Sequence, residues 1–292
     1  ELRALTDSYG GRMMVGEIAP GSFELMRDYT SGQNRLHTAY SFDLLGDWPG
    51  VEQLAQIISQ WGEGPDDGWP SWALSNHDVV RVATRWGGAI GATPEQAAPL
   101  FLVLLLALRG TIFLYQGEEC GLPEADVPFE KLQDPWGIAG WPNFKGRDGC
   151  RTPMPWEPDA PNAGFTGGEP WLPVDKAHIT PRMVEIGERP IPIAELAAVL
   201  IGRRQDSPAL KRGGLKVLAA GSGVLVIERD PDGEKARVAL NFSAEPSRID
   251  LPRSGGGSGR MFGHGVALDA AATPAHVTLP PFGWLWVEGR WA

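Results

Sequence analysis

The sequence predicts an α/β fold with parallel strands, followed by a small antiparallel β-domain. Over residues 1–210, short apolar strands alternate with helices, a pattern that indicates parallel pairing through right-handed crossovers. These strands are apolar on both faces, as buried parallel strands are. Over residues 211–292, short strands are instead separated by Gly, Pro and Asp turns, which is typical of an antiparallel domain. The 292 residues, 42% of them hydrophobic, suffice for more than one packed core.

Four strand–helix units follow one another in the first part. Strands are predicted at 12–17, 38–45, 71–78 and 111–115, and a helix at 51–61 follows the second strand. Another helix runs to Gly110 and begins with a capping box, in which Thr93 is the N-cap, Pro94 takes the first position and Gln96 closes the box. The opening "ELRALTDSYGG" has the pattern of a helix already under way, so we expect that a preceding segment has been removed.

The second half of the chain is rich in loops and short strands. A long loop is expected over 116–190, with a helix at 194–204 behind Pro181, Pro190 and Pro192, which break helices and leave its start in doubt. Further strands are predicted at 215–221, 223–230, 236–243, 247–252, 276–280 and 283–289, with a flexible loop at 253–260.

Composition excludes several classes of protein. The net charge is −10 and no Lys/Arg-rich run occurs, so the footprint of a nucleic-acid binder is missing. The longest apolar run, 97–108, is too short to cross a membrane. Cys120 and Cys150 form neither a disulfide framework nor a metal motif. We expect a cytoplasmic protein, and no cofactor bound by this chain. The chain has twelve Trp residues together with many Gly and Pro residues. This composition fits loops whose aromatic rings stack on sugars, and it fits a large core equally well.

Polar residues follow the predicted parallel strands, where active sites of such folds lie. They are Glu17, Asp43 or its neighbours, the pair His77–Asp78, and residues 116–119. No His or Asp spacing of a metal site appears among them, and paired carboxylates between aromatic loops favour glycoside hydrolysis. Alternatives remain at each position, because Glu17 fits a loop or cap, Asp78 fits a helix N-cap, and "YQGEE" fits a polar turn.

Six motifs carry a family resemblance. In this order, "VGEI" (15–18), "SNHDVVR" (75–81) and "YQGEE" (115–119) resemble motifs of the α-amylase family, glycoside hydrolase family 13. The α-glucosidase and oligo-1,6-glucosidase branch is indicated by "LQDPWG" (132–137), "GRDGCRTPMPW" (146–156) and "GFTGGEPWLPV" (164–174). The resemblance implies the carboxyl-terminal half of a (β/α)₈ TIM barrel, with strands five to eight, followed by a small antiparallel β-sandwich.

The resemblance also implies roles for individual residues in a retaining mechanism. Glu17 matches the general acid/base, and Asp78 matches the carboxylate that stabilises the transition state. His77 resembles a residue that binds sugar hydroxyls in the first subsite. Arg147 resembles a substrate-contacting arginine, although an ion pair with Asp148 or another loop acid is an alternative.

Two further residues near the predicted site have less specific roles. Phe42, at the second predicted strand, is a candidate platform for a sugar ring or a core residue. Arg81 is expected to be structural and to hold Asp78 in place.

The nucleophile of the family is missing from these residues. In the family it follows the fourth strand in a motif of the type G-[FV]-R-x-D, which this sequence lacks, and a barrel needs eight strands where four are predicted. We therefore expect the missing amino-terminal half of the barrel as a partner, with an oligosaccharide or α-glucoside as substrate. The predicted activity is a retaining α-glucosidase that releases terminal α-linked glucose. A transglycosylating α-glucosyltransferase and a non-catalytic fragment are the alternatives.

Overall fold

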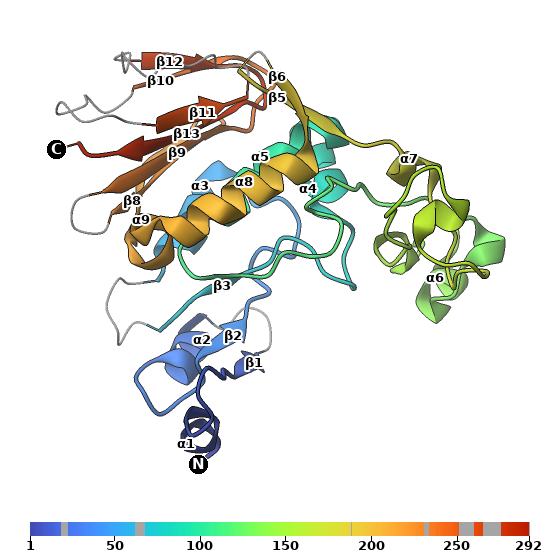
Figure 1. Ribbon diagram of the computed structural model, residues 1–292, viewed down its shortest axis with the longest axis horizontal. Helices are drawn as coiled ribbons and strands as arrows, with labels where there is room; N and C mark the ends of the chain where they lie inside the picture. The colour runs from blue at the N-terminus through green and yellow to red at the C-terminus, as the bar shows by residue number, and fades with distance from the viewer. Residues whose placement is uncertain are drawn as a thin grey trace.

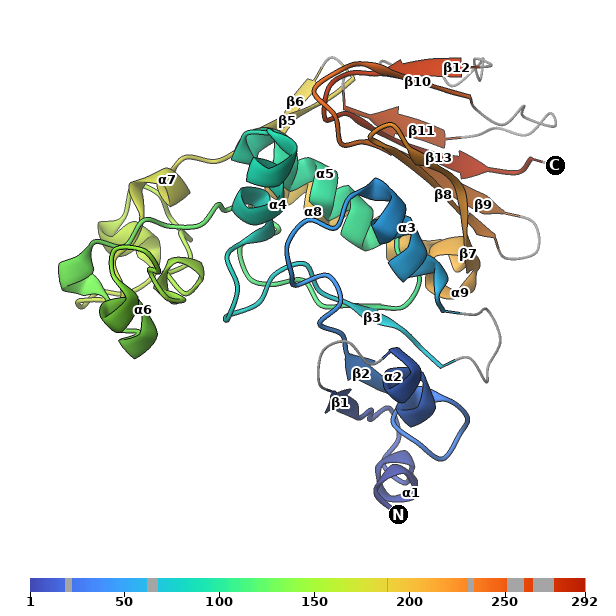
Figure 2. The same cartoon turned by 180° about the vertical axis from the view of Figure 1, so that it is seen from behind.

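The computed structural model describes residues 1–18, 23–61, 68–187, 189–230, 234–250, 260–264 and 276–291. Its parts are arranged around two long helices, α5 (Pro94–Ala107) and α8 (Ile193–Asp206) (Figure 1). On one side of these helices lies the β-domain, and on the other lie the strands of the first part of the chain. A loop-rich region carrying the short helices α6 and α7 projects away from both, as the view from behind also shows (Figure 2).

The strands of the first part pair in parallel, as predicted. They are β1 (Val15–Glu17), β2 (Thr38–Tyr40), β3 (Ser71–Trp72) and β4 (Thr111–Ile112), and β1 pairs with β2 while β3 pairs with β4. Side chains join the two pairs: the Ser71 hydroxyl donates to the Ala39 carbonyl (2.5 Å) and accepts from the Ser41 N–H (3.0 Å). The strands are shorter than predicted, and each pairs over only two or three residues.

Helices flank these strands. They are α1 (Leu2–Asp7), α2 (Phe23–Thr30), α3 (Val51–Ser59), α4 (Val82–Ile90), α5, α8 and α9 (Pro208–Arg212). The predicted capping box of α5 is confirmed, with Thr93 and Gln96 bonding each other's backbone N–H. The sequence indicated α4 only as an alternative, with Asp78 as its N-cap, and α4 contains two glycines, which have poor helix propensity. Gly87 is needed there, since a Cβ atom would come within 2.7 Å of the Ala97 Cβ on α5.

Helix α5 is the centre of the main core. Every residue from Ala97 to Ala107 is buried, as expected for a helix that is apolar on all sides. Helices α4 and α8 and the β-domain pack around it. Within the described ranges, no single helix has the length and apolarity to cross a membrane; α4 and α5, bent by 107° at their junction, pass that test only as a pair.

Two arginines, the half-buried Arg204 and the buried Arg229, satisfy the carbonyls at the end of α5. Arg204 donates to the carbonyls of Leu106 and Leu108 at 2.8 Å, and to that of Gly110 at 2.6 Å. Arg229 donates to the Ala107 carbonyl (3.0 Å) and to three carbonyls around α9 and β7. The last carbonyls of a helix lack partners within the helix and favour a cation. Burial lowers the pKa of Arg229 to about 9 and that of Arg204 to about 10.

The hairpin before α8 explains the proline-rich segment. Strands β5 (Met183–Ile186) and β6 (Arg189–Pro192) pair antiparallel, with Pro190 and Pro192 in β6. Helix α8 begins at the next residue, Ile193, so the predicted helix over 194–204 is confirmed. The prolines end the hairpin and leave the helix itself unbroken, since none of them lies inside it.

The loop-rich region contains little regular structure. It holds α6 (Pro135–Gly140), α7 (Lys176–Ile179) and three short 3₁₀ turns, at Phe129–Lys131, Asp148–Cys150 and Pro161–Gly164. This agrees with the long loop predicted over 116–190, except that strand β5 and the start of β6 fall within its last residues.

The β-domain is an antiparallel sandwich, as predicted. Its strands are β7 (Gly214–Gly221), β8 (Val224–Asp230), β9 (Lys235–Asn241), β10 (Ser247–Asp250), β11 (Arg260–Gly263), β12 (His276–Leu279) and β13 (Trp284–Gly289). The large sheet has the order β11-β13-β9-β8-β7, and β10 pairs with β12. Trp284 and Trp286 face the core around α5, whereas Leu285 and Val287 face β10 and β12.

One prediction in this domain was partly wrong. Residues 253–259 of the predicted flexible loop lie outside the described residues, but Arg260 begins strand β11, which pairs with β13. The sequence analysis missed this strand because it follows directly on a glycine-rich stretch.

Replacing Arg229 with methionine should lower the free energy of unfolding by about 3 kcal/mol, because buried carbonyls lose their charged donor. Chemical denaturation of the full-length protein measures this loss. Arg212→Met is the control, since this arginine lies exposed on α9, and it should change stability little. Equal stability of the two variants would contradict the role given to Arg229.

Candidate active site

The ends of all four parallel strands line one cavity. It has a volume of about 340 Å³ and is lined by Glu17, Tyr40, Phe42, Ser75, Asn76, His77, Asp78, Phe113, Leu114 and Tyr115. The structure therefore brings Glu17, Phe42, His77 and Asp78 together, although they come from three separate parts of the sequence. The volume is in the range of small-molecule sites.

Aromatic rings form one wall of this cavity. The rings of Tyr40 and Phe42 meet edge to face with centroids 5.3 Å apart, and Tyr40 meets Phe113 in the same way at 5.1 Å. Burial raises the pKa of Tyr40, and the negative charges of Glu118, Asp78 and Glu17 add to this effect. The carboxylates thus lie close to a shared aromatic wall.

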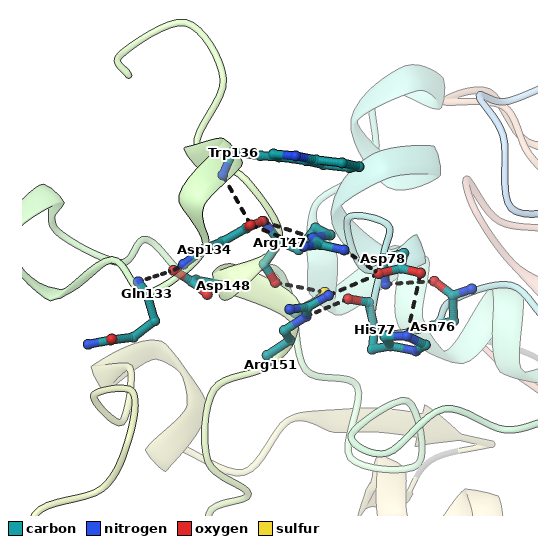
Figure 3. Close-up of polar contacts among 10 residues, drawn as sticks. Asn76, His77, Asp78, Gln133, Asp134, Trp136, Arg147, Asp148 and Arg151 are labelled. Carbon is teal, nitrogen blue, oxygen red and sulfur yellow. Dashed lines mark hydrogen bonds and ion pairs between the residues drawn. The ribbon is translucent and has the colours of Figure 1, made fainter. Parts of the chain in front are cut away.

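Asp78 is held by several donors (Figure 3). Its Oδ1 accepts hydrogen bonds from Arg147 Nη1 (3.1 Å) and Arg151 Nη2 (2.9 Å), and its Oδ2 lies 3.4 Å from His77 Nε2. Its backbone N–H donates to Asn76 Oδ1 at 2.8 Å. Asp78 does not cap α4, whose N-cap position is Arg81.

Arg147 forms an ion pair with a loop acid, the alternative given for it, and its contact with substrate stays a prediction. Its guanidinium binds Asp134 through Nε (2.9 Å) and Nη2 (3.1 Å) while Nη1 reaches Asp78, and the Trp136 ring lies 4.7 Å away (Figure 3). Asp134 is therefore the loop acid in this pair. Asp148 instead accepts backbone N–H bonds from Gln133 and Asp134. The hydrogen bond from Arg147 lowers the pKa of Asp134 to about 2.

The partner predicted for Arg81 was wrong. Arg81 is buried, and its guanidinium donates to the carbonyls of Gln116 (2.7 Å) and Cys150 (3.0 Å) and lies over the Tyr115 ring. It is structural, as predicted, but it joins the turn after β4 to the loop-rich region. Arg147 and Arg151, not Arg81, bind the Asp78 carboxylate. The sequence analysis missed Arg151, although it stands in the same motif as Arg147.

The other predicted strand-end acids lie outside the cavity lining. Asp43 accepts a hydrogen bond from the Ser41 hydroxyl (3.1 Å), and burial raises its pKa. Glu118 is buried behind the cavity, where its Oε2 accepts the Tyr115 N–H at 2.8 Å. Burial raises the pKa of Glu118 to about 7. In the part of the chain that the structure describes, no group of three or more His, Cys, Asp and Glu is arranged to hold a metal ion.

Family models match both parts of the chain. The model of the alpha amylase catalytic domain matches residues 1–213, and that of the maltogenic amylase C-terminal domain matches residues 215–286. The chain therefore belongs to the α-amylase family, glycoside hydrolase family 13.

Within this family the chain is similar to proteins named as glucosidases. It is 39% identical over 255 residues to a probable alpha-glucosidase of Rhizobium meliloti (strain 1021), covering 86% of this chain and 46% of that protein. It is 31% identical over 275 residues to an oligo-1,6-glucosidase of Heyndrickxia coagulans, covering 82% and 49%. The chain spans about half the length of these relatives and matches their carboxyl-terminal part.

Solved structures agree with the predicted fold. The α-glucosyl transfer enzyme XgtA superposes with a TM-score of 0.80 at 38% identity, covering 99% of this chain and 53% of that chain. A trehalose-6-phosphate hydrolase of Bacillus licheniformis has a TM-score of 0.79 at 21% identity, a likeness of fold alone. The predicted half barrel followed by a β-sandwich is confirmed.

Glu118 should make stability depend on pH. Its folded-state pKa of about 7 lies above the 4.5 of an exposed glutamate, so between these values the folded protein keeps a proton that the unfolded chain has released. Stability therefore falls as the pH rises through this window. Glu118→Gln removes this loss. As the pH rises from 4.5 to 7, the difference in free energy of unfolding between the variant and the wild type should therefore grow in favour of the variant, by on the order of 3 kcal/mol.

Denaturant titrations of both full-length proteins across this pH range measure the difference. Glu119→Gln, at a half-buried side chain in the same turn, controls for removing one negative charge. A gap between Glu118→Gln and the wild type that stays constant with pH would refute the assignment.

Proposed function

We propose that the complete protein is a retaining α-glucosidase that releases terminal α-linked glucose from short oligosaccharides or α-glucosides. The observation that carries this proposal is the single cavity shared by Glu17 and Asp78, with an aromatic wall suited to a sugar ring. The relatives named alpha-glucosidase and oligo-1,6-glucosidase support the same substrate class.

Three residues of the cavity have roles in the proposed reaction. Glu17 donates a proton to the glycosidic oxygen as the bond to the leaving sugar breaks, while a nucleophilic carboxylate from the amino-terminal half forms an ester with the glucosyl carbon. Glu17 then takes a proton from water, which attacks that carbon and releases glucose. Asp78 and His77 bind hydroxyls of the ring, and Asp78 stabilises the positive charge that develops on it.

The face that would receive the amino-terminal half lies at the start of the chain. A groove of about 710 Å³ there is lined by Leu2, Leu25, Tyr29 and Leu36 with several polar residues, and Leu2, Leu25 and Tyr29 are exposed. Among the described strands, β1 pairs with β2 alone, so its other edge is open. An open parallel edge beside an apolar groove suits a preceding strand–helix unit, and the relatives are about twice as long as this chain.

Glucosyl transfer is the second candidate. The chain is 38% identical to the α-glucosyl transfer enzyme XgtA. The glucosyl ester formed in the first step reacts with a sugar or alcohol in the same way as with water, so the two activities differ only in the acceptor.

Glu17→Gln and Asp78→Asn should each lower kcat for maltose or isomaltose by about 10²–10⁴-fold in the full-length protein, because each removes a group needed in the transition state. Glucose release measures the rate, and NMR of the first product tests for the α-anomer expected of a retaining enzyme. Glu24→Gln on α2 is the control and should keep full activity. Rapid hydrolysis by Glu17→Gln would overturn the proposal.

Leu25→Glu should weaken assembly with the amino-terminal half, because a charge replaces an apolar side chain in the groove. When this chain is co-expressed with a separate amino-terminal half, co-purification and recovered activity should both fall at least tenfold. Val199→Glu, at an exposed apolar position on α8, is the matched control and should leave both unchanged. Unchanged assembly by Leu25→Glu would place the partner elsewhere.

A further inference from the structure

Arg151 contacts two consecutive residues after β3, His77 and Asp78. Its Nε donates to the His77 carbonyl at 2.7 Å, and its Nη2 donates to Asp78 Oδ1 at 2.9 Å (Figure 3). One planar guanidinium therefore fixes both the backbone and the carboxylate. The Arg151 side chain is 20% exposed and that of Asp78 is 48% exposed, so the pair lies at the edge of the cavity, and its bond to the carboxylate is charge-assisted.

The segment that carries Arg151 is itself fixed by hydrogen bonds to Arg81 and Tyr115. The carbonyl of the preceding residue, Cys150, accepts hydrogen bonds from Arg81 Nη2 (3.0 Å) and from the Tyr115 hydroxyl (2.9 Å). Tyr115 follows β4 and lines the same cavity as Asp78. The backbone before Arg151 is therefore fixed to the end of β4, and its side chain reaches the residues that follow β3.

We infer that Arg151 is a positioning residue, which sets the orientation of the His77–Asp78 pair towards the sugar. This inference rests on the proposed function. Arg147 is less suited to this role, because two of its nitrogens bind Asp134 and only one reaches Asp78. Both side-chain bonds of Arg151 go to His77 and Asp78. Arg151 and Arg147 both donate to Oδ1 of Asp78, so Oδ2 lies on the side of His77 and remains available to a sugar hydroxyl.

The fork of the guanidinium matters as much as its charge. A lysine at this position supplies one ammonium, which cannot span the His77 carbonyl and Asp78 Oδ1 with the same planar geometry. A misplaced carboxylate loses most of its effect in the transition state, where its bonds to the ring strengthen, and less in the ground state. The loss should therefore fall on kcat rather than on KM.

The test compares Arg151→Ala and Arg151→Lys with the wild type in the full-length protein, using maltose or isomaltose. Arg151→Ala should lower kcat by about 10²-fold and Arg151→Lys by about tenfold, with KM changed less than threefold. Added guanidinium ion at low concentration should restore part of the activity of Arg151→Ala, whereas ammonium should not. Lys145→Met is the control: it removes a cation and an exposed ion pair with Asp126 from the same loop and should keep wild-type kinetics.

The outcomes separate this inference from the proposed function. An inactive wild type would refute the proposed function, and the inference would fall with it. An active wild type with Arg151→Ala within twofold of its kcat, or without guanidinium rescue, would refute the positioning role alone. Thermal unfolding checks that Arg151→Ala is folded. If it is not, Arg151→Lys decides, and a wild-type kcat in that variant overturns the inference.

Discussion

The parallel pairing of β1 with β2 and of β3 with β4 determines where the site lies. Parallel strands present their carboxyl ends at the same edge, so residues that follow them meet around one cavity. Pairing of this kind requires helical crossovers, and the buried helix α5 supplies the core against which they pack. At the end of α5, Arg204 ties this core to α8 and the buried Arg229 ties it to the β-domain. The site is therefore a consequence of how the core is built.

Chemical detail at the site comes from the loop-rich region. Asp134, Arg147 and Arg151 approach Asp78 from positions more than fifty residues away in the sequence. Both arginines bind the Asp78 carboxylate, and Asp134 binds Arg147 and orients it. The same region is anchored through the Cys150 carbonyl to Arg81 and Tyr115. A loop without regular secondary structure thus places two guanidinium groups accurately, because its polar contacts converge on the strand ends.

The order and type of most elements could be predicted from local patterns. The capping box at Thr93, the start of the antiparallel domain and the strand-end positions of Glu17 and His77–Asp78 all depend on neighbouring residues. The lengths of the strands, helix α4, strand β11 and the partners of Arg81 and Asp78 depend on contacts between distant segments, which no local pattern encodes. Gly87 illustrates this difference, since it disfavours a helix locally yet permits α4 to pack closely against α5. The catalytic roles came from the family resemblance, and the structure supplies the shared cavity that makes them chemically coherent.

Glu17 and Asp78 should act on the same glucosyl ring. A crystal structure of the complete protein with bound glucose would test this. We expect a glucose ring in the cavity beside Tyr40 and Phe42, with its 2- and 3-hydroxyls on Asp78 and its anomeric oxygen within hydrogen-bond distance of Glu17. Glucose bound in this cavity but out of reach of either carboxylate, or a complete barrel in which the two acids face separate cavities, would contradict it.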